Sequence, residues 1–336
     1  MSLQEVARVA GVSIATVSRV INGNYFVTDE TKQRVLEAIQ KLNYRPNGVA
    51  KSLRGARTKT IGLIVPDIPN PYFSSIIAEV EHSAHDNGYN IILGNSNDDP
   101  QKEISLLNLM FEKRVDGIVI APSRSKASET LSEFIREKTP IVIVDRKLED
   151  LEVSTVVEEN EVSSYELVNH LIIMGHRRIA LINSSMDIST VKARGSGYLR
   201  ALTDAQIEVD ESIIKLGKFD TVTGYTSTKS LFSGKHEPPT AIFCANNVIA
   251  VGCLIALREL NLSVPSDVSV ICFGNILFQE LISPKLTTVI QNPTAIGITA
   301  ARLLMDQLDV NGNFATETVI LPTEIRLGNS VARLSP

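Results

Sequence analysis

The chain has 336 residues, and 43% of them are hydrophobic, which is enough for two or three compact domains and excludes a largely disordered protein. No apolar run reaches the ~18 residues of a membrane span, and no basic and then apolar leader follows Met1. The sequence therefore predicts a cytoplasmic protein with no membrane partner. Its three cysteines show no C-x-x-C spacing and are expected to be small buried side chains.

Charge is unevenly distributed along the chain. Residues 1–59 hold ten of the 33 Lys and Arg residues and four of the 38 Asp and Glu residues, a local net charge of +6. The remaining residues carry −11, which gives −5 for the whole chain. A basic segment on an acidic body indicates that only this first segment approaches a polyanion such as DNA.

The first predicted elements are two short helices joined by a tight turn. Leu3, Val6, Ala7 and Ala10 lie at helical spacing, and Gly11 suits the left-handed backbone of a turn. Two helices joined in this way form a helix-turn-helix, whose second helix enters the major groove of DNA. The spacing by itself is equally compatible with another small helical bundle.

The second helix is predicted from Ile14 to about Ile21, with Ser13 as its N-cap and with Val17 and Val20 on its inner face. Small and methyl-bearing side chains suit thymine, hydroxyl groups suit phosphate, and an arginine suits a bidentate contact with guanine. The candidate DNA contacts of this helix are Ser13, Ile14, Ala15, Thr16, Ser18, Arg19 and Asn22.

A third helix is predicted after Thr28, which would cap it, with Asp29 and Glu30 near its positive end. The side chains expected to pack inward are Val35, Leu36, Ile39 and Leu42. The three helices predict a helix-turn-helix DNA-binding domain over residues 1–46.

Two stretches carry a family resemblance: VARVAGVSIATVSRVING and, further on, YRPNGVAKSLR. They resemble the lactose/galactose repressor (LacI–GalR) family of transcription regulators, closest in style to the purine and ribose repressors and catabolite control protein A. The resemblance implies a homodimer on a palindromic operator with a central C-G step. It also implies a linker over residues 47–59 in which residues 47–54 form a hinge helix on DNA. There Asn47, Leu53 and Arg54 would contact DNA, and the leucine would wedge into the minor groove.

From Thr60 onward, apolar strands alternate with helical stretches, which predicts an α/β fold. The predicted strands cover residues 61–65, 90–93, 117–120, 141–144, 178–182, 240–244 and 268–271. The predicted helices cover residues 72–87, 101–113, 126–137, 161–174, 192–205, 223–232, 246–260 and 293–308. This order predicts two doubly wound parallel-sheet lobes with a crevice at the carboxyl ends of the strands.

By the same resemblance, residues 60–336 form an effector-binding and dimerisation domain of the periplasmic-binding-protein type. The chain would cross between the lobes three times. The implied first lobe covers residues of about 60–158 and 289–318, and the second about 159–288 and 319–336. No heptads follow Arg326, so we expect a dimer rather than a tetramer.

The resemblance also assigns effector contacts to the crevice. They are Asn70, Tyr72, Phe73, Arg146, Arg194, Phe219, Asn247 and Gly274. Relatives usually have Asp at the last two positions, and a third acidic position survives only as Glu159.

The loss of two carboxylates beside two arginines leaves positive charge unbalanced, and a buried unpaired guanidinium is costly. The first hypothesis is an anionic effector, such as a sugar acid or sugar phosphate, bound by Arg146 and Arg194. The second is that Asp145 or Glu159 neutralises the arginines and the effector is a neutral sugar. The third is a crevice that binds nothing.

Other functions lack their motifs. The sequence contains no dinucleotide or P-loop glycine motif, no nucleophile elbow and no H-E-x-x-H, so we expect no cofactor, no metal and no catalysis. A solute-binding protein would share the lobes without needing the basic head. The sequence thus predicts a transcription repressor whose operator affinity is set by a small effector. A protein co-effector docking near Arg302 is the alternative.

Overall fold

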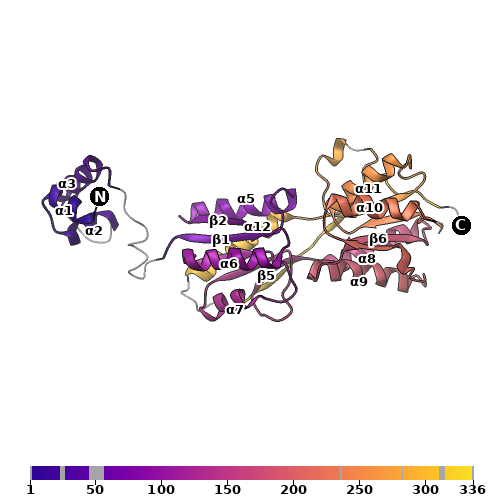
Figure 1. The fold of residues 1–336 in the computed structure, drawn as a ribbon, viewed down its shortest axis with the longest axis horizontal. Helices are drawn as coiled ribbons and strands as arrows, with labels where there is room; N and C mark the ends of the chain where they lie inside the picture. The colour runs from indigo at the N-terminus through magenta and orange to yellow at the C-terminus, as the bar shows by residue number, and fades with distance from the viewer. Residues whose placement is uncertain are drawn as a thin grey trace. The chain divides into compact units, whose positions relative to one another are not determined.

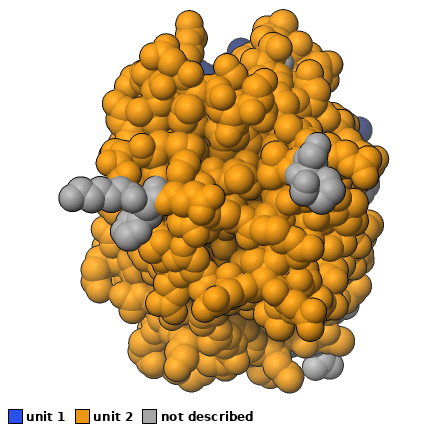
Figure 2. Space-filling model, turned by 90° about the vertical axis from the view of Figure 1, so that its right-hand side faces the viewer, with its two compact units in different colours: residues 1–58 blue, residues 59–336 orange. Residues whose placement is uncertain are grey.

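The computed structural model describes residues 2–22, 27–44, 57–234, 237–281, 283–309 and 315–334. The chain divides into two compact units, residues 1–58 and 59–336 (Figure 2). The described part of the first unit is helical, and the second unit contains two sheets with helices on both faces (Figure 1).

The first unit is built from α1 (Leu3–Ala10), α2 (Ile14–Asn22) and α3 (Asp29–Lys41). Ser2 and Glu5 form a capping box at the start of α1, and Gly11 ends that helix at a φ of +65°. Val6, Val17 and Val35, one from each helix, are fully buried in a common small core. The helix-turn-helix predicted for this unit is confirmed.

Two details of α3 differ from the prediction. Leu36 was expected to pack inward and is 51% exposed, because Val35 and Ala38 form the buried face of the helix. Thr28 occupies the N-cap position, but its hydroxyl donates to the Thr31 hydroxyl at 2.9 Å and caps no backbone N–H.

The first lobe of the second unit contains a six-stranded parallel sheet in the order β11-β5-β4-β3-β1-β2. Its strands are β1 (Thr60–Val65), β2 (Asn90–Asn95), β3 (Gly117–Ile120), β4 (Ile141–Val144), β5 (Ser154–Glu158) and β11 (Thr318–Leu321). Its helices are α5 (Pro71–Asp86), α6 (Pro100–Lys113), α7 (Glu129–Arg136) and α12 (Pro293–Asp309).

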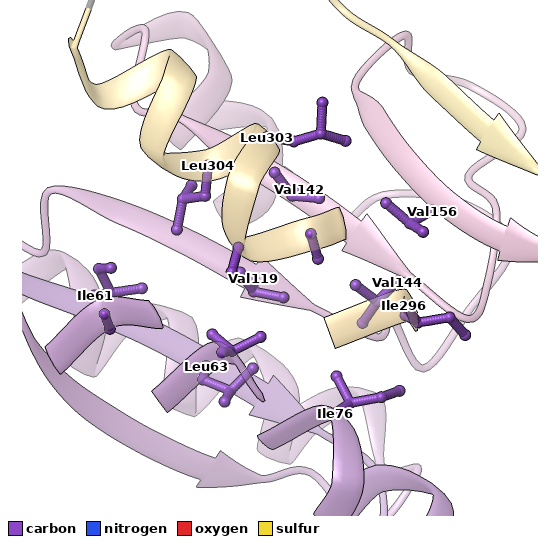
Figure 3. Close-up of a cluster of buried hydrophobic side chains, with 14 of the residues drawn as sticks. Ile61, Leu63, Ile76, Val119, Val142, Val144, Val156, Ile296, Leu303 and Leu304 are labelled. Carbon is purple, nitrogen blue, oxygen red and sulfur yellow. The ribbon is translucent and has the colours of Figure 1, made fainter. Parts of the chain in front are cut away.

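Both faces of this sheet are covered by apolar packing. The side chains of Leu63, Val119 and Val142 meet Ile296 and Leu304 of α12 on one face (Figure 3). Helices α6 and α7 cover the opposite face with a second cluster. Burial on both sides favours apolar residues, which is why β3 and β4 read as unbroken hydrophobic runs.

The second lobe contains a six-stranded sheet in the order β12-β10-β9-β8-β6-β7, in which only β12 is antiparallel to its neighbour. Its strands are β6 (Ile179–Ser184), β7 (Ile214–Gly217), β8 (Ala241–Cys244), β9 (Ser269–Phe273), β10 (Thr287–Ile290) and β12 (Glu324–Arg326). Its helices are α8 (Asn160–Ile173), α9 (Ser189–Asp204), α10 (Thr221–Phe232) and α11 (Asn247–Glu259), with short 3-10 turns at Glu211–Ile213 and Gln279–Leu281.

The sheets confirm the two-lobed α/β fold and change its bounds. Strand β10 lies in the second sheet and α12 packs on the first, so the second crossing falls between Ile290 and Pro293 rather than after residue 288. Strand β11 lies in the first sheet and β12 in the second, so the third crossing falls between Leu321 and Glu324 rather than after residue 318. Hydrogen bonding between strands decides these bounds, and the apolar pattern does not report it.

The three cysteines, Cys244, Cys253 and Cys272, are buried and unpaired, as their spacing predicts. No helix within the described ranges is both long and apolar enough to span a bilayer.

Candidate functional site

The outer face of α2 carries the predicted DNA contacts. Ser13 caps the helix, because its hydroxyl accepts the Thr16 N–H at 3.1 Å and lies 2.9 Å from the Thr16 hydroxyl. Ile14 is 42% exposed, and Ala15 and Arg19 are also exposed. An exposed face of this composition is what base reading in a major groove requires.

Of the remaining predicted DNA contacts, the structure describes the side chain of Ser18 alone. Ser18 is half-buried on α2. Asn22 is the last residue of α2, and its side chain lies outside the described residues. Asn47, Leu53 and Arg54 also lie outside the described residues.

A crevice pocket lies between the lobes at the carboxyl ends of several strands. Its lining consists of Asn70, Tyr72, Phe73, Asp145, Arg146, Thr190, Arg194, Phe219, Asn246, Asn247 and Gln291. The structure therefore brings seven of the eight predicted effector contacts to one place. The eighth, Gly274, adjoins the pocket, because a Cβ at that position would lie 2.7 Å from Gln291 Oε1.

Tyr72 connects two carboxylates in the crevice. Its hydroxyl donates to Asp145 Oδ1 at 2.9 Å and lies 3.3 Å from Glu158 Oε2. Burial and the two neighbouring acids raise the pKa of Tyr72 well above its usual value. The tyrosine therefore stays neutral and acts as a hydrogen-bond donor.

Arg146 is buried and already paired. Its Nη1 donates to Asp98 Oδ1 at 2.6 Å and to the Pro122 carbonyl oxygen at 2.8 Å, and its Nε lies 3.4 Å from Asp145 Oδ2. Burial lowers the pKa of Arg146, but the nearby carboxylates of Asp98 and Asp145 outweigh it and raise the pKa overall. The positive charge of this guanidinium is balanced inside the first lobe.

Arg194 is equally buried but bonds only to neutral groups. Its Nε donates to Asn160 Oδ1 at 2.8 Å, its Nη1 donates to the Ala245 carbonyl oxygen at 2.7 Å, and its guanidinium lies 3.9 Å from the centre of the Phe273 ring. Phe219, the predicted aromatic contact, is 6.0 Å away. Burial lowers the pKa of Arg194, and none of the ion pairs among the described residues includes it.

Glu158 is the buried acid of the crevice, whereas Glu159, the acid expected there, is exposed at the start of α8. Glu158 accepts Gln291 Nε2 at 2.6 Å and the Asn292 N–H at 2.7 Å. Burial raises the pKa of Glu158, against the effect of these hydrogen bonds. The side chain at the end of β5 turns inward, and the one after it turns out to solvent.

Sequence reasoning did not assign Glu158, Thr190, Asn246 and Gln291 to the site. Three of them end or closely follow a strand: Glu158 ends β5, Asn246 follows β8, and Gln291 follows β10. The carboxyl ends of parallel strands form the ligand edge of an α/β sheet, and this rule is the signal that was available for those three.

Comparisons with known proteins give one consistent result. The family model described as "Periplasmic binding proteins and sugar binding domain of LacI family" matches residues 58–326. The model described as "Bacterial regulatory proteins, lacI family" matches residues 2–47.

Individual relatives cover between 82% and 99% of this chain. The HTH-type transcriptional repressor PurR of Mannheimia succiniciproducens is 34% identical over 99% of both chains. Among solved structures, the transcriptional regulator CelR–cellobiose complex is 28% identical with a TM-score of 0.73, covering 98% of this chain and 99% of that one. A LacI family transcriptional regulator from Enterococcus faecium with bound ribose is 30% identical with a TM-score of 0.72, covering 82% of this chain and 100% of that one.

Proposed function

This chain belongs to the LacI family of bacterial regulatory proteins, a family of DNA-binding repressors with small-molecule effectors, and we propose that its own effector is a neutral polyhydroxylated molecule of the sugar class. The observation that carries the proposal is the pairing of Arg146 with Asp98 and Asp145. Arg146 Nη1 is taken by Asp98 and the Pro122 carbonyl oxygen. Its Nε makes no hydrogen bond but lies 3.4 Å from Asp145 Oδ2, so two carboxylates already compensate the charge that an anion would need.

The charge balance of the crevice supports a neutral ligand. Arg146 and Arg194 lie near four buried or half-buried acids, Asp98, Glu103, Asp145 and Glu158. Burial raises the pKa of Glu103 and Glu158, but the acids still offset the two arginines, so an added carboxylate or phosphate finds no excess of positive charge. Arg194 offers its Nη2 group, which has no hydrogen-bond partner among the described residues. The N–H donors of this group together with amide side chains suit hydroxyl and ring oxygens. This reasoning favours the neutral-sugar hypothesis over the two-arginine anion clamp.

Calorimetry with the full-length protein tests the proposal. The panel pairs neutral pentoses and hexoses with their acids and phosphates, and each binder is then added to an operator-binding assay by fluorescence anisotropy. We expect a neutral member to bind and to shift operator affinity, and Arg194→Met to weaken its binding. Binding of the acids or phosphates alone would overturn the proposal.

A protein co-effector near Arg302 gains no support from the geometry of α12. Arg302 pairs with Asp306 at 3.1 Å and lies 3.9 Å from Glu317. A docking site for an acidic partner needs a cluster of basic side chains without acidic neighbours. Asp306 and Glu317 already balance the charge of Arg302.

The DNA-bound form follows from the family. We propose a homodimer on a palindromic operator of ~14–16 base pairs with a central C-G step, where the recognition helices of the two chains read the two half-sites. Large apolar side chains left exposed in the second lobe, such as Ile255, Phe278 and Leu281, support a second copy as partner. Since a bacterial repressor acts where its operator is, we place the protein in the cytoplasm.

Effector control is proposed to act through the lobes. A ligand that favours one lobe arrangement changes how the two first lobes face each other in the dimer, and thereby whether residues 47–54 of the two chains meet over the operator centre. Leu53→Ala is expected to weaken operator binding and reduce DNA bending, and unchanged bending in a gel-shift bending assay would exclude the wedge.

A further inference from the structure

A lysine outside the crevice pocket links the two lobes. Lys192, near the start of α9 in the second lobe, places Nζ 2.6 Å from Glu149 Oε1 of the first lobe. The same Nζ lies 2.7 Å from Asp187 Oδ1 of its own lobe. A single ammonium group thus bridges a carboxylate from each side of the crevice.

Backbone contacts beside this lysine also cross between the lobes. The Ser125 N–H of the first lobe donates to the Asp187 carbonyl oxygen at 2.7 Å, and the Ser125 hydroxyl lies 3.1 Å from Asp187 Oδ1. The Lys147 N–H donates to Ser189 Oγ at 2.7 Å. We refer to this group as the clasp; its members are Ser125, Lys147, Glu149, Asp187, Ser189 and Lys192.

The first-lobe side of the clasp is organised by a crevice residue. The loops after β3 and β4 are tied together, because the Glu149 N–H donates to the Ser125 carbonyl oxygen at 2.8 Å and the Ala127 N–H to Asp150 Oδ1 at 3.0 Å. Arg146 adds its bond to the Pro122 carbonyl oxygen of the same pair of loops. Glu149 and Ser125 therefore move as one body with Arg146.

The second-lobe residues of the clasp are also connected directly to the crevice. Lys192 and Arg194 lie on the same helix, α9, two positions apart. Within the crevice, Asn247 Nδ2 of the second lobe donates to Asn70 Oδ1 of the first at 3.2 Å. The pocket that remains has a volume of about 40 Å³, far below the ~300 Å³ at which small-molecule sites begin. A sugar-sized ligand seated among Asn70, Arg194 and Asn247 therefore needs the lobes to move apart, although a second pocket of about 310 Å³ adjoins this one at Asp145.

We propose that the clasp holds the lobes together through the chain's own side chains, and that its Lys192 bridge breaks whenever the crevice opens. Lys192 and Glu149 are about half exposed (49% and 47%), so their pair is screened by water and salt. The bridge biases the lobes toward closure without locking them. The proposal concerns the lobes alone and holds for any effector chemistry.

Pulsed EPR distances between two spin labels test this directly in the full-length protein, with neither DNA nor ligand added. The native cysteines are buried, so labels react at introduced cysteines, here at the exposed positions Glu133 of α7 and Thr203 of α9. Doubly labelled chains are diluted with unlabelled protein so that only distances within one chain are seen. The variant is Lys192→Met, which keeps side-chain length and removes the charge.

The matched control is Lys229→Met. Lys229 Nζ lies 2.9 Å from Glu259 Oε2 and 2.7 Å from the Tyr225 hydroxyl, and all three residues belong to the second lobe. It is 41% exposed, similar to Lys192. Its replacement removes an equivalent ion pair without touching the lobe interface.

We expect Lys192→Met to raise the population of long interlobe distances about fivefold, since the exposed ion pair with Glu149 across the crevice is lost. In the parent, 1 M NaCl should have the same effect, because the Debye length falls to ~3 Å and the ion pair is screened. In the variant the pair is already absent, so salt should cause no further opening. Lys229→Met should leave the distances unchanged. The proposal is overturned if the parent and Lys192→Met have identical interlobe distance distributions and equal melting temperatures. It is also overturned if Lys229→Met opens the lobes as much as Lys192→Met does.

Discussion

Replacing Asp98 with asparagine tests whether the charge of Arg146 is balanced within the first lobe. Asp98 Oδ1 lies 2.6 Å from Arg146 Nη1, and the two side chains are 20% and 3% exposed. Asp98 has a φ of +54°, a backbone conformation that asparagine tolerates well, so Asp98→Asn removes the charge with little added strain.

The magnitude follows from what remains around the arginine. Removing one partner of a buried ion pair costs ~3–5 kcal/mol when the other charge is left alone. Here Asp145 still lies 3.4 Å from Arg146 Nε, and the new amide oxygen can accept from Nη1, so we expect a loss of ~2 kcal/mol. Most of that loss should disappear when Arg146 is replaced as well.

A double-mutant cycle measures this coupling. Urea unfolding is followed by circular dichroism for the parent, Asp98→Asn, Arg146→Met and the double variant, and the analysis is confined to the transition of residues 59–336. We expect a coupling free energy of ~1–2 kcal/mol. A loss below ~0.5 kcal/mol in Asp98→Asn, or strictly additive costs, would refute the pairing argument and restore the anion clamp.

Three further outcomes are expected. Arg19→Ala should cost ~1–3 kcal/mol of operator binding and relax base preference, whereas an equal loss on all sequences, measured by anisotropy, would make it a phosphate contact. Gly197→Ala should lower the melting temperature by several degrees, because its Cβ would lie 2.4 Å from the Glu161 carbonyl oxygen; Gly195→Ala, whose nearest contact is 3.7 Å, is the control. Burial lowers the pKa of His176, so stability should be full above about pH 6.5 and decline below it; His176→Gln should flatten this part of a thermal-melt pH series.

Local sequence was sufficient for much of the fold. The helix-turn-helix was predictable because capping, helical spacing and a left-handed glycine act within a few residues, as Ser13 and Gly11 illustrate. Strands β1, β3 and β4 of the first sheet and β6, β8 and β9 of the second were predictable because burial on two faces favours apolar runs. Strands β7, β11 and β12 were not predicted, since they lie at sheet edges and read as mixed sequence. Strands β5 and β10 were also missed, although they are interior, because Ser154, Thr155, Thr287 and Thr288 interrupt their apolar pattern.

The candidate site divides in the same way. Family motifs indicated the crevice residues, but only the tertiary structure decided what charge they present. Asp98 reaches Arg146 across 48 positions and Gln291 reaches Glu158 across 133 positions, and no local pattern reports such pairs. Neighbours along the chain, such as Glu158 and Glu159, take opposite environments because β5 ends at the first and the second lies at the exposed start of α8. The sequence by itself thus determined the family and the place of the crevice, whereas the balance of charge within it is a property of contacts between distant segments.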